Sequence, residues 1–323
     1  MTDPDFQDVV HALAPSPDFA RDGICFAAQA SGLYRSSDGC LTWRSAYDSL
    51  ELSDDLATPS VALSPTFAAD HTVFAGISGS ILRSHDGGET WQASELPLPP
   101  PLVSCLAVSP NYEIDGVLFA GTMEDGVFRS ADRGAHWMAW NFGLYDLHIL
   151  ALAISPNFEE DNTLFVGTET GVFRSTTNGR SWRELPFPDE WAPVLSLAVS
   201  SAYQFDGVLH AGTESCGLLK STDGGETWTR LGEDVMTEAV NHIILAPSYP
   251  AIPHLLVLSS DGLFVSRDAG ASWLAWPLGK LADEELMAVA TPNGLEPGAS
   301  LLVGMVDGRV LRTGTSLEKA RRR

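Results

Sequence analysis

Ser84-His85-Asp86-Gly87-Gly88-Glu89-Thr90-Trp91 is one of six related octapeptides in this chain of 323 residues. The tryptophans that end the copies are spaced 45 to 48 residues apart. So regular a period indicates one supersecondary unit repeated, and a period in the mid-forties is typical of a four-stranded propeller blade. The recurring positions are Ser36, Asp38 and Trp43; Ser84, Asp86 and Trp91; Ser130, Asp132 and Trp137; Ser175 and Trp182; Ser221, Asp223 and Trp228; and Ser266, Asp268 and Trp273.

Short apolar runs ahead of each octapeptide predict the strands of the unit. In the third unit they lie near 106–108, 117–121 and 126–130, and a fourth strand is expected at 136–140. The runs are rich in β-branched and aromatic residues, and Gly, Pro, Asn and Asp flank them, which favours strands over helices. We therefore predict four strands per unit, A to D in chain order.

Counting the units predicts an all-β, seven-bladed β-propeller that fills one domain, residues 1–323. Its blades are expected at approximately 9–58, 59–102, 103–147, 148–193, 194–239, 240–284 and 285–323. The octapeptide of the seventh unit has decayed, and the chain ends soon after it, so that blade lacks an obvious strand D. Either the outer edge of this blade is short, or residues 3–7 supply the strand and close the ring by pairing the two termini.

The pattern Ser-x-Asp-x-Gly-x-Thr-Trp resembles the Asp-box, also called the BNR repeat. This repeat occurs in sialidases, family 74 glycoside hydrolases, sortilin-type receptors and the photosystem II stability/assembly factor family. The resemblance spans nearly the whole chain and implies a β-hairpin between the third and fourth strands of each blade, but no particular activity. The departures are Cys40 for Gly, Thr177 for Asp, and His136, Ser181 and Ser272 for Thr.

The box residues have a structural explanation of their own. An Asp in a tight turn accepts backbone N–H bonds, Gly adopts the positive φ that the turn needs, and Trp buries a large apolar body. Because the motif repeats and an active site is needed once, we interpret the box residues as structural.

Composition excludes several classes of partner. The net charge of −23 argues against nucleic acid and anionic membranes, which both require a basic surface. The N-terminal residues lack the pattern of a signal peptide, and Cys25, Cys40, Cys105 and Cys216 show no Cys-x-x-Cys spacing. These features predict free thiols and a cytoplasmic location.

No catalytic or cofactor pattern stands out, and we predict a non-enzymatic protein with no cofactor and no metal. The sialidase arginine triad is not expected, because Arg35, Arg83, Arg129, Arg174 and Arg312 share one repeat position and so cannot converge on a single pocket. A glycosidase would need a carboxylate pair, and no pair is singled out among the acidic residues Glu51, Asp54, Asp55, Glu124, Asp125, Asp189, Glu190, Glu214, Asp283, Glu284 and Glu285. The histidines lack metal-site spacing, although His148 and His242 lie near the start of a strand A.

The connections between blades are the least repetitive segments, so a partner is expected there. The candidate binding residues are Phe142, Tyr145, Asp146, Phe187, Asp189, Glu190 and Trp191. If their aromatic rings are exposed, they would form a patch with an acidic rim, which suits a protein or peptide partner with basic residues. If the rings pack under their own loops, the patch is lost. The predicted function is a protein-binding scaffold or assembly-type factor, and the alternative is a carbohydrate-binding protein or glycoside hydrolase.

Overall fold

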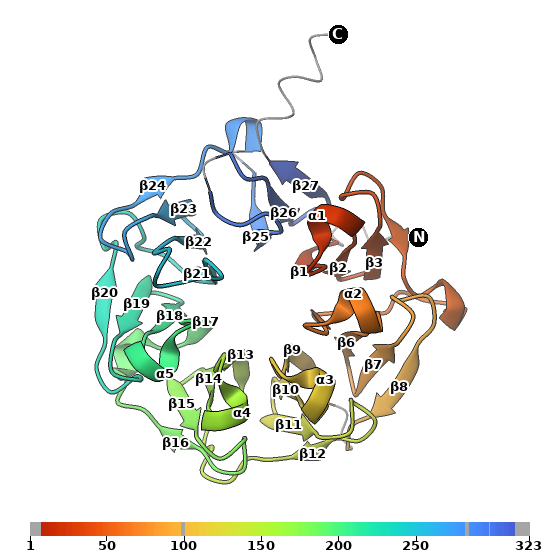
Figure 1. Ribbon diagram of the computed structural model, residues 1–323, viewed down its shortest axis with the longest axis horizontal. Coiled ribbons are helices and arrows are strands. Elements are labelled where there is room, and N and C mark those ends of the chain that lie inside the picture. Colours follow the sequence, from red (N-terminus) through yellow and green to blue (C-terminus); the bar gives the residue numbers. More distant parts are fainter. Residues whose placement is uncertain (1–7, 98–100, 282–283, 297, 314–323) are drawn as a thin grey trace.

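Seven antiparallel sheets stand in a ring around a central opening (Figure 1). The computed structural model describes residues 8–97, 101–281, 284–296 and 298–313. Within these ranges six sheets have four strands and one has three, each in chain order from the inside of the ring outward. The predicted all-β, seven-bladed propeller is confirmed.

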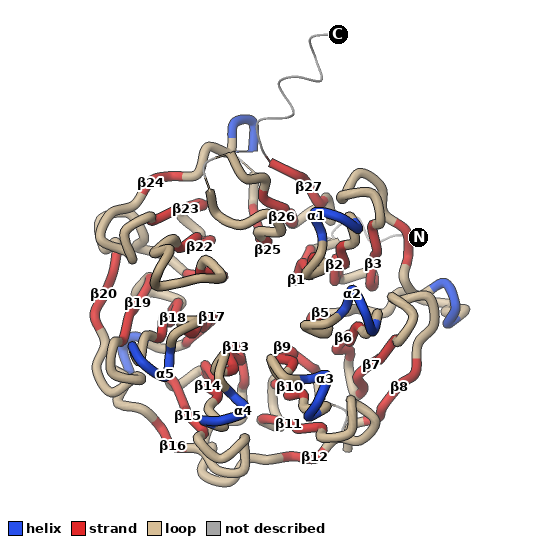
Figure 2. The backbone as a smooth tube through the Cα atoms, in the orientation of Figure 1, coloured by secondary structure: helices blue, strands red, loops and turns tan. Residues whose placement is uncertain are grey.

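The strands are short, and tight connections join them (Figure 2). Blades one to four contain β1 (Val10–Pro15), β2 (Cys25–Gln29), β3 (Gly32–Ser36), β4 (Arg44–Ser45); β5 (Ser60–Leu63), β6 (Val73–Ile77), β7 (Ser80–Ser84), β8 (Gln92–Glu95); β9 (Val103–Val108), β10 (Leu118–Thr122), β11 (Val127–Ser130), β12 (Met138–Ala139); and β13 (Ile149–Ile154), β14 (Leu164–Thr168), β15 (Val172–Ser175), β16 (Arg183–Glu184). Blades five to seven contain β17 (Val194–Val199), β18 (Leu209–Thr213), β19 (Leu218–Ser221), β20 (Thr229–Leu231); β21 (Val240–Leu245), β22 (Leu255–Ser259), β23 (Gly262–Ser266), β24 (Leu274–Ala275); and β25 (Leu286–Ala290), β26 (Leu301–Met305), β27 (Val310–Thr313).

Helical turns occur only in the connections of the described chain. Between the first and second strands of blades one to five lie α1 (Phe19–Asp22), α2 (Phe67–Asp70), α3 (Tyr112–Asp115), α4 (Phe158–Asp161) and α5 (Tyr203–Asp206); the 3-10 turns η1 (Asp48–Leu50), η2 (Asp189–Trp191) and η3 (Gly279–Leu281) lie between blades. No helix in the described part of the chain is long and apolar enough to span a membrane.

A serine and an aspartate clasp each of these five A–B connections. Ser109 Oγ donates to Asp115 Oδ2 at 2.6 Å, and the other carboxylate oxygen accepts the Val117 N–H at 2.8 Å. The same pair recurs as Ser16 and Asp22, Ser64 and Asp70, Ser155 and Asp161, and Ser200 and Asp206. The clasp fixes the turn without help from other blades, which explains why this part of the repeat varies so little in length.

The six octapeptides form the hairpins between the third and fourth strands. In the second blade, Asp86 Oδ1 accepts Ser84 Oγ at 2.7 Å and the Thr90 N–H at 2.9 Å, and Oδ2 accepts Thr90 Oγ1 at 2.6 Å. Gly88 adopts φ +86°. Asp86 thus binds the turn of its own hairpin, and Gly88 adopts the positive φ that this turn requires.

Aromatic rings and the indoles of the box tryptophans join neighbouring blades. An aromatic ring on the second strand of each of blades one to five meets one on the next A–B connection edge to face, as Phe119 does with Phe158 at 5.8 Å between centroids. Such pairs add to the energy of burial. The box Trp91 donates its indole N–H to the Ala46 carbonyl of the preceding blade at 2.7 Å. Trp182 does the same to Trp140, whereas the other four box indoles have no partner among the described residues.

The arginines at the shared repeat position also reach across blade boundaries. Arg83 Nη1 donates to the Arg133 carbonyl at 2.9 Å, and Arg129 Nε donates to Asn178 Oδ1 at 2.9 Å. Both acceptors lie in the Asp-box turn of the next blade. Arg35 pairs with Glu89 in the same way. These side chains are dispersed around the ring, as predicted, and hold adjacent blades together.

Blade seven has three strands within the described residues, and β27 is its outermost strand. The closing strand that the sequence predicts at residues 3–7 lies outside the described residues. Blades seven and one pack together through β25, β26 and β1, where Gly304 lies against Val10. The inner strands therefore close the ring at this junction.

Candidate functional site

The disc has two faces of different construction. Because the strands of a blade alternate in direction, the A–B connections and the Asp-box hairpins lie on one face, and we call this the box face. The other face, the loop face, consists of the B–C turns and the D–A connections between blades. Its D–A segments are 46–59, 96–97, 101–102, 140–148, 185–193, 232–239, 276–281 and 284–285, and its B–C segments are 30–31, 78–79, 123–126, 169–171, 214–217, 260–261 and 306–309.

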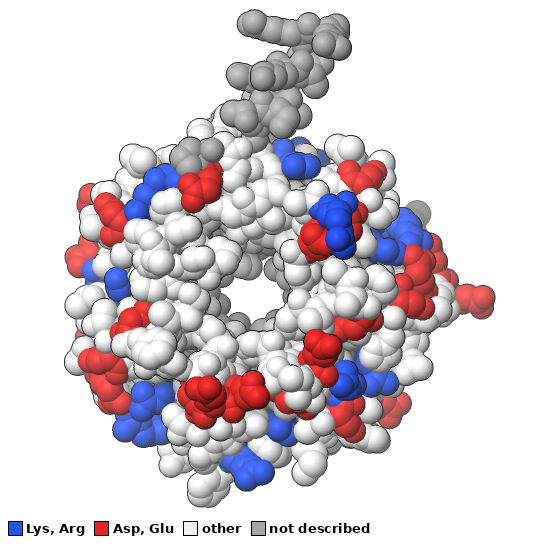
Figure 3. All heavy atoms as spheres, in the orientation of Figure 1, with Lys and Arg blue, Asp and Glu red and all other residues white. Residues whose placement is uncertain are grey.

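The box face carries charges of both signs. In Figure 1 the helices α1–α5 lie in the foreground, so Figure 3 shows this face. Blue and red side chains are interspersed around the disc, and no blue or red atoms border the central opening in this view (Figure 3). Many of these charges already have partners inside the protein, as Arg174 does with Glu226 at 3.2 Å.

The loop face is strongly acidic. Its segments contain two basic residues, Lys280 and Arg309, and Arg309 is already bound to Asp307 at 2.5 Å and Glu284 at 2.7 Å. The exposed acidic residues of these segments are Asp48, Glu51, Asp54, Asp55, Glu124, Glu169, Asp189, Glu190, Glu214, Glu233, Asp234, Glu238, Asp261, Glu284, Glu285 and Asp307. Much of the net charge of the chain is therefore concentrated on one side of the disc.

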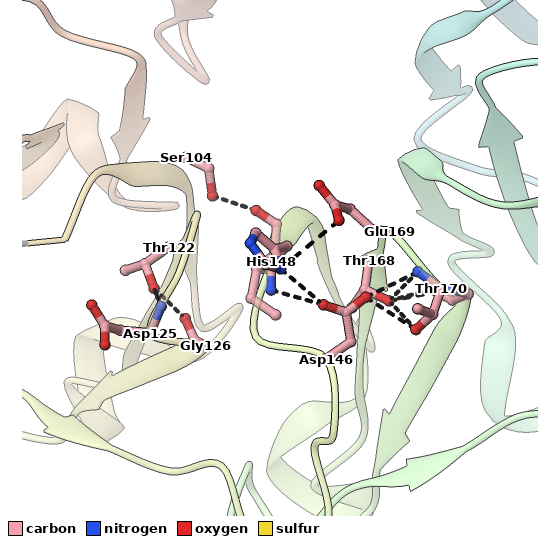
Figure 4. A network of polar contacts seen from close by, with 11 residues as sticks. Ser104, Thr122, Asp125, Gly126, Asp146, His148, Thr168, Glu169 and Thr170 are labelled. Carbon is pink, nitrogen blue, oxygen red and sulfur yellow. Dashed lines mark hydrogen bonds and ion pairs between the residues drawn. The ribbon is translucent and has the colours of Figure 1, made fainter.

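Hydrogen bonds between connections hold the loop face in shape. Asp146, at the end of a D–A connection, accepts the Thr170 N–H at 2.9 Å, Thr170 Oγ1 at 3.0 Å and the His148 N–H at 3.0 Å (Figure 4). Burial opposes ionisation here, but these hydrogen bonds outweigh it and hold the pKa of Asp146 below its usual value. Asp146 is 9% exposed, so its carboxylate belongs to the scaffold of the face.

His148 and Glu169 lie beside this clasp. His148 Nδ1 lies 3.3 Å from Asp146 Oδ1 and 3.9 Å from Glu169 Oε2 (Figure 4). The other histidine near a strand A, His242, contacts the Met287 carbonyl through Nε2 at 3.1 Å. The residues that the structure describes include no group of three or more ligands able to hold a metal ion.

The four candidate aromatic residues divide into two pairs. Phe142 and Tyr145 are 81% and 83% exposed, and they share the connection between blades three and four. Phe187 and Trp191 are partly buried in the core shared by blades four and five, with their rings 6.3 Å apart and Phe187 5.4 Å from Trp228. Asp189 and Glu190 lie exposed between this pair. Phe142 and Tyr145 therefore offer free rings, whereas Phe187 and Trp191 pack under their own loop.

A cavity opens on the same face in blade one. It has a volume of about 400 Å³, and its lining includes Tyr34, Tyr47, Glu51, Asp54 and Asp55. The Tyr47 hydroxyl contacts Thr58 Oγ1 at 3.0 Å, and burial raises the pKa of Tyr47 above its usual value, which keeps the ring neutral. The cavity thus combines aromatic walls with carboxylates on its rim.

Sequence reasoning missed the segregation of charge between the two faces. It named many of these acidic residues only as candidates for a catalytic pair, and it passed over Glu233, Asp234 and Glu238. The signal was nevertheless present, because nearly every one of them falls in a D–A connection or a B–C turn of the predicted blades.

The comparisons with known proteins agree with this architecture. A family model, BNR/Asp-box repeat, matches residues 82–93 and 219–230. No curated protein matches the sequence.

Solved structures share the fold at low sequence identity. A GH74 xyloglucanase from Xanthomonas campestris is 18% identical with a TM-score of 0.70, and the match covers 95% of this chain and 52% of the enzyme. An extracellular domain from B. thetaiotaomicron is 14% identical with a TM-score of 0.69, covering 96% of this chain and 38% of that one. YCF48 bound to D1 peptide is 15% identical with a TM-score of 0.69, covering 96% of this chain and 93% of YCF48. The chain thus spans about half of the xyloglucanase, 38% of the B. thetaiotaomicron protein and nearly all of YCF48.

Proposed function

We propose that this β-propeller, which carries BNR/Asp-box repeats, is a protein-binding scaffold. Its loop face would take a basic, extended segment of another protein. The observation that carries the proposal is the concentration of exposed carboxylates on that face, with Arg309 already neutralised by its own neighbours. A surface of one sign attracts a partner of the other, accelerates encounter and rejects acidic competitors.

Phe142 and Tyr145 supply the apolar part of the proposed surface. Exposed aromatic rings on a rigid loop bury a large area at a small entropic cost, and they are common among residues that dominate binding energy. Both rings lie beside the Asp146 clasp, which fixes the end of their connection to the turn of blade four. The partner would therefore contact a preformed surface.

A whole-length fold match supports a peptide ligand for this architecture. YCF48, which matches the chain over 93% of its own length, has been solved bound to D1 peptide. A single seven-bladed disc of this kind can therefore serve as a peptide-binding module without a second domain. For this chain we propose the same general mode, the binding of a peptide segment. The basic character of that segment follows from the negative charge of the loop face.

The first test compares matched charge changes on the two faces. Asp189→Asn/Glu190→Gln/Glu214→Gln removes three charges from the loop face, and Glu113→Gln/Glu159→Gln/Glu160→Gln removes three from the box face. Binding of fluorescent lysine- and arginine-rich peptides would be measured by anisotropy over a range of salt concentration. We expect the loop-face variant to bind at least about 10-fold more weakly at low salt and the box-face variant within about 2-fold of wild type. Equal loss in both variants, or tighter binding of acidic peptides, would refute the proposal.

A second test concerns the aromatic residues. Phe142→Ala/Tyr145→Ala should weaken capture of a native partner from cell lysate while leaving thermal unfolding unchanged, because both rings are exposed. Phe187→Ala/Trp191→Ala should instead lower the melting temperature, because those rings pack against the core. If the Phe142→Ala/Tyr145→Ala variant captures the partner as well as wild type does, these two rings are not part of the binding surface.

The blade-one cavity favours one alternative function, a glycan site. Aromatic walls stack against sugar rings, and two carboxylates at a suitable separation are the basis of glycoside hydrolysis. Glu51→Gln/Asp54→Asn would be compared with wild type for binding and cleavage of soluble glucan oligosaccharides by calorimetry and chromatography. Binding or cleavage that disappears in this variant would support the alternative, and its absence in wild type would exclude these substrates.

A further inference from the structure

Cys40 occupies a position where the other Asp-boxes have glycine. Its φ is +69°, a backbone conformation that residues with a side chain rarely adopt. The equivalent residues of the other hairpins are Gly88, Gly134, Gly179, Gly225 and Gly270, all with positive φ. A cysteine here carries a conformational cost that glycine would avoid.

Packing explains why the other blades exclude a side chain at this position. A Cβ atom on Gly88 would lie 2.8 Å from Phe26 Cε1 of the preceding blade, and one on Gly134 would lie 2.9 Å from Phe74 Cε1. For Cys40 the preceding blade is the seventh, which presents Leu302 in place of the aromatic ring. Blade one therefore has room for a small side chain, but the room alone does not explain a cysteine.

A second cysteine in the same blade also departs from the repeat. Cys25 begins β2, at a position that Val73, Leu118, Leu164, Leu209, Leu255 and Leu301 hold in the other blades. Cys25 and Cys40 are fully or almost fully buried and belong to one cluster with Phe19, Ala290 and Leu302. The two departures from the repeat therefore meet at the junction of blade one with blade seven.

The backbone holds the two cysteines side by side. Cys25 pairs with Ser36 in the β2–β3 ladder, and the Cys40 N–H donates to Ser36 Oγ at 3.0 Å. One residue earlier, the Gly39 N–H donates to the Gly23 carbonyl at 3.0 Å. Ser36 is thus a common neighbour that fixes the hairpin turn against the start of β2.

We propose that Cys25 and Cys40 are a redox-active pair that forms a disulfide within blade one, at the junction where the ring closes. In the structure both thiols are reduced. Oxidation would convert two thiols into one S–S bond and link the Asp-box turn covalently to β2. None of the other blades has a cysteine at either position.

A low-molecular-weight disulfide such as oxidised glutathione balances the reaction. One cysteine thiolate attacks a sulfur of glutathione disulfide and releases the first glutathione thiolate. The second cysteine thiolate attacks the mixed disulfide and releases the second. Two protein thiols thereby lose two protons and two electrons, and one glutathione disulfide becomes two glutathione thiols.

Burial determines when the reaction occurs. Desolvation, together with the neighbouring Cys40 thiol, raises the pKa of Cys25 well above its usual value, so its thiolate is scarce in the folded protein. Oxidation is therefore expected to be slow in the native state and faster during folding or when the junction between blades one and seven opens. Once formed, the link would hold the blade-one side of that junction.

The test uses the full chain refolded in a buffer of oxidised and reduced glutathione. After denaturation, free thiols are blocked with N-ethylmaleimide and the protein is digested with trypsin. Cleavage after Arg21, Arg35 and Arg44 places the two cysteines on separate peptides, 22–35 and 36–44. We expect mass spectrometry to find these peptides disulfide-linked, with two of the four cysteines no longer alkylated.

Variants built from the repeat itself provide the controls. Cys40→Gly and Cys25→Leu restore the residues of the other blades and should abolish the linked peptide, whereas Cys105→Ser/Cys216→Ser should retain it. Oxidised wild type should unfold roughly 3–6 °C above its reduced form, a difference that Cys40→Gly should lose. Recovery of both peptides singly alkylated, as stable glutathione adducts, or linked to Cys105 or Cys216 would overturn the proposal.

Discussion

On the box face, Asp86 accepts four hydrogen bonds within its own hairpin, whereas on the loop face Glu233 and Asp234 have no polar partner among the described residues. Both faces derive from the same seven repeats. Most aspartates of the box face form turns, whereas most carboxylates of the loop face lie free in solvent. The contrast indicates that the box half of the repeat stabilises the disc, while the loop half is less constrained by contacts of its own.

Glycine substitutions should show the largest difference between the faces. Gly88 on the box face and Gly279 on the loop face both have positive φ, but a Cβ on Gly88 would lie 2.8 Å from Phe26, whereas one on Gly279 would meet nothing within 4 Å. Gly88→Ala should cost about 2–4 kcal/mol through strain and overpacking, and Gly279→Ala about 1 kcal/mol through strain alone. Urea denaturation measures both, and equal losses would show that the faces do not differ in packing.

His210 is the next test, because it replaces a phenylalanine in the row of aromatic contacts beneath the box face. It takes the position that Phe26, Phe74, Phe119 and Phe165 hold in other blades and packs against Tyr249 at 5.8 Å. Both ring nitrogens are buried without a partner among the described residues. Desolvation, with a smaller contribution from Lys220, lowers the pKa of His210 to about 3.

His210→Phe should therefore change how stability depends on pH. The unfolded chain protonates this histidine below about pH 6.5 and the folded chain does not, so its contribution to stability is lost as pH falls from about 6.5 towards 3. Wild type should lose about 2 kcal/mol from this residue between pH 7 and pH 5, and the variant should not. Chemical denaturation at both pH values measures the difference, and parallel losses in the two proteins would exclude His210 as the cause.

A direct comparison of single carboxylates on the two faces follows. Asp86→Ala leaves the Ser84, Glu89 and Thr90 donors without their acceptor and should cost about 1–2 kcal/mol. Asp234→Ala on the loop face should stay within about 0.5 kcal/mol of wild type. Thermal unfolding at pH 7 measures both, and a larger cost for Asp234 would reverse the assignment of roles to the faces.

The Asp86 effect should also disappear in acid. Burial opposes ionisation, but hydrogen bonds from Thr90, Ser84 and Glu89 outweigh it and lower the pKa of Asp86 to about 2. Because the folded pKa lies below the unfolded value, the stabilisation is present above about pH 4 and is lost as pH falls towards 2. The difference between wild type and Asp86→Ala should shrink over that interval.

The box face was predictable from the sequence and the detail of the loop face was not. A hairpin such as 84–91 is determined by turn residues a few positions apart, and each copy confirms the others. The Asp146 clasp joins residues 24 positions apart, and the burial of Phe187 depends on Trp228 in the next blade. Their counterparts in blade one use other residue types, Asp8 with Ser31 and Tyr47 with Trp91, so no fixed residue pattern in the sequence reveals these contacts.

Blade four provides the smallest test, because its box lacks the aspartate. Thr177 Oγ1 accepts the Ser181 N–H at 2.9 Å and contacts the Ser181 hydroxyl at 2.9 Å, which replaces part of the carboxylate network. The Asn178 φ of +60° and the Gly179 φ of +84° show that the turn has kept its conformation.

Thr177→Asp should therefore fit without rearrangement and stabilise the protein by about 0.5–1 kcal/mol, because a carboxylate accepts more of the turn's donors than a hydroxyl does. Thermal unfolding at pH 7 and pH 3 separates the contributions. The gain should be present at pH 7 and diminished at pH 3, because an aspartate in the unfolded chain, with a pKa of about 3.9, is by then largely protonated. A gain that is equal at the two pH values would mean that the added side chain acts through packing, and the turn network of the other five boxes would then be a weaker guide to the stability of this face.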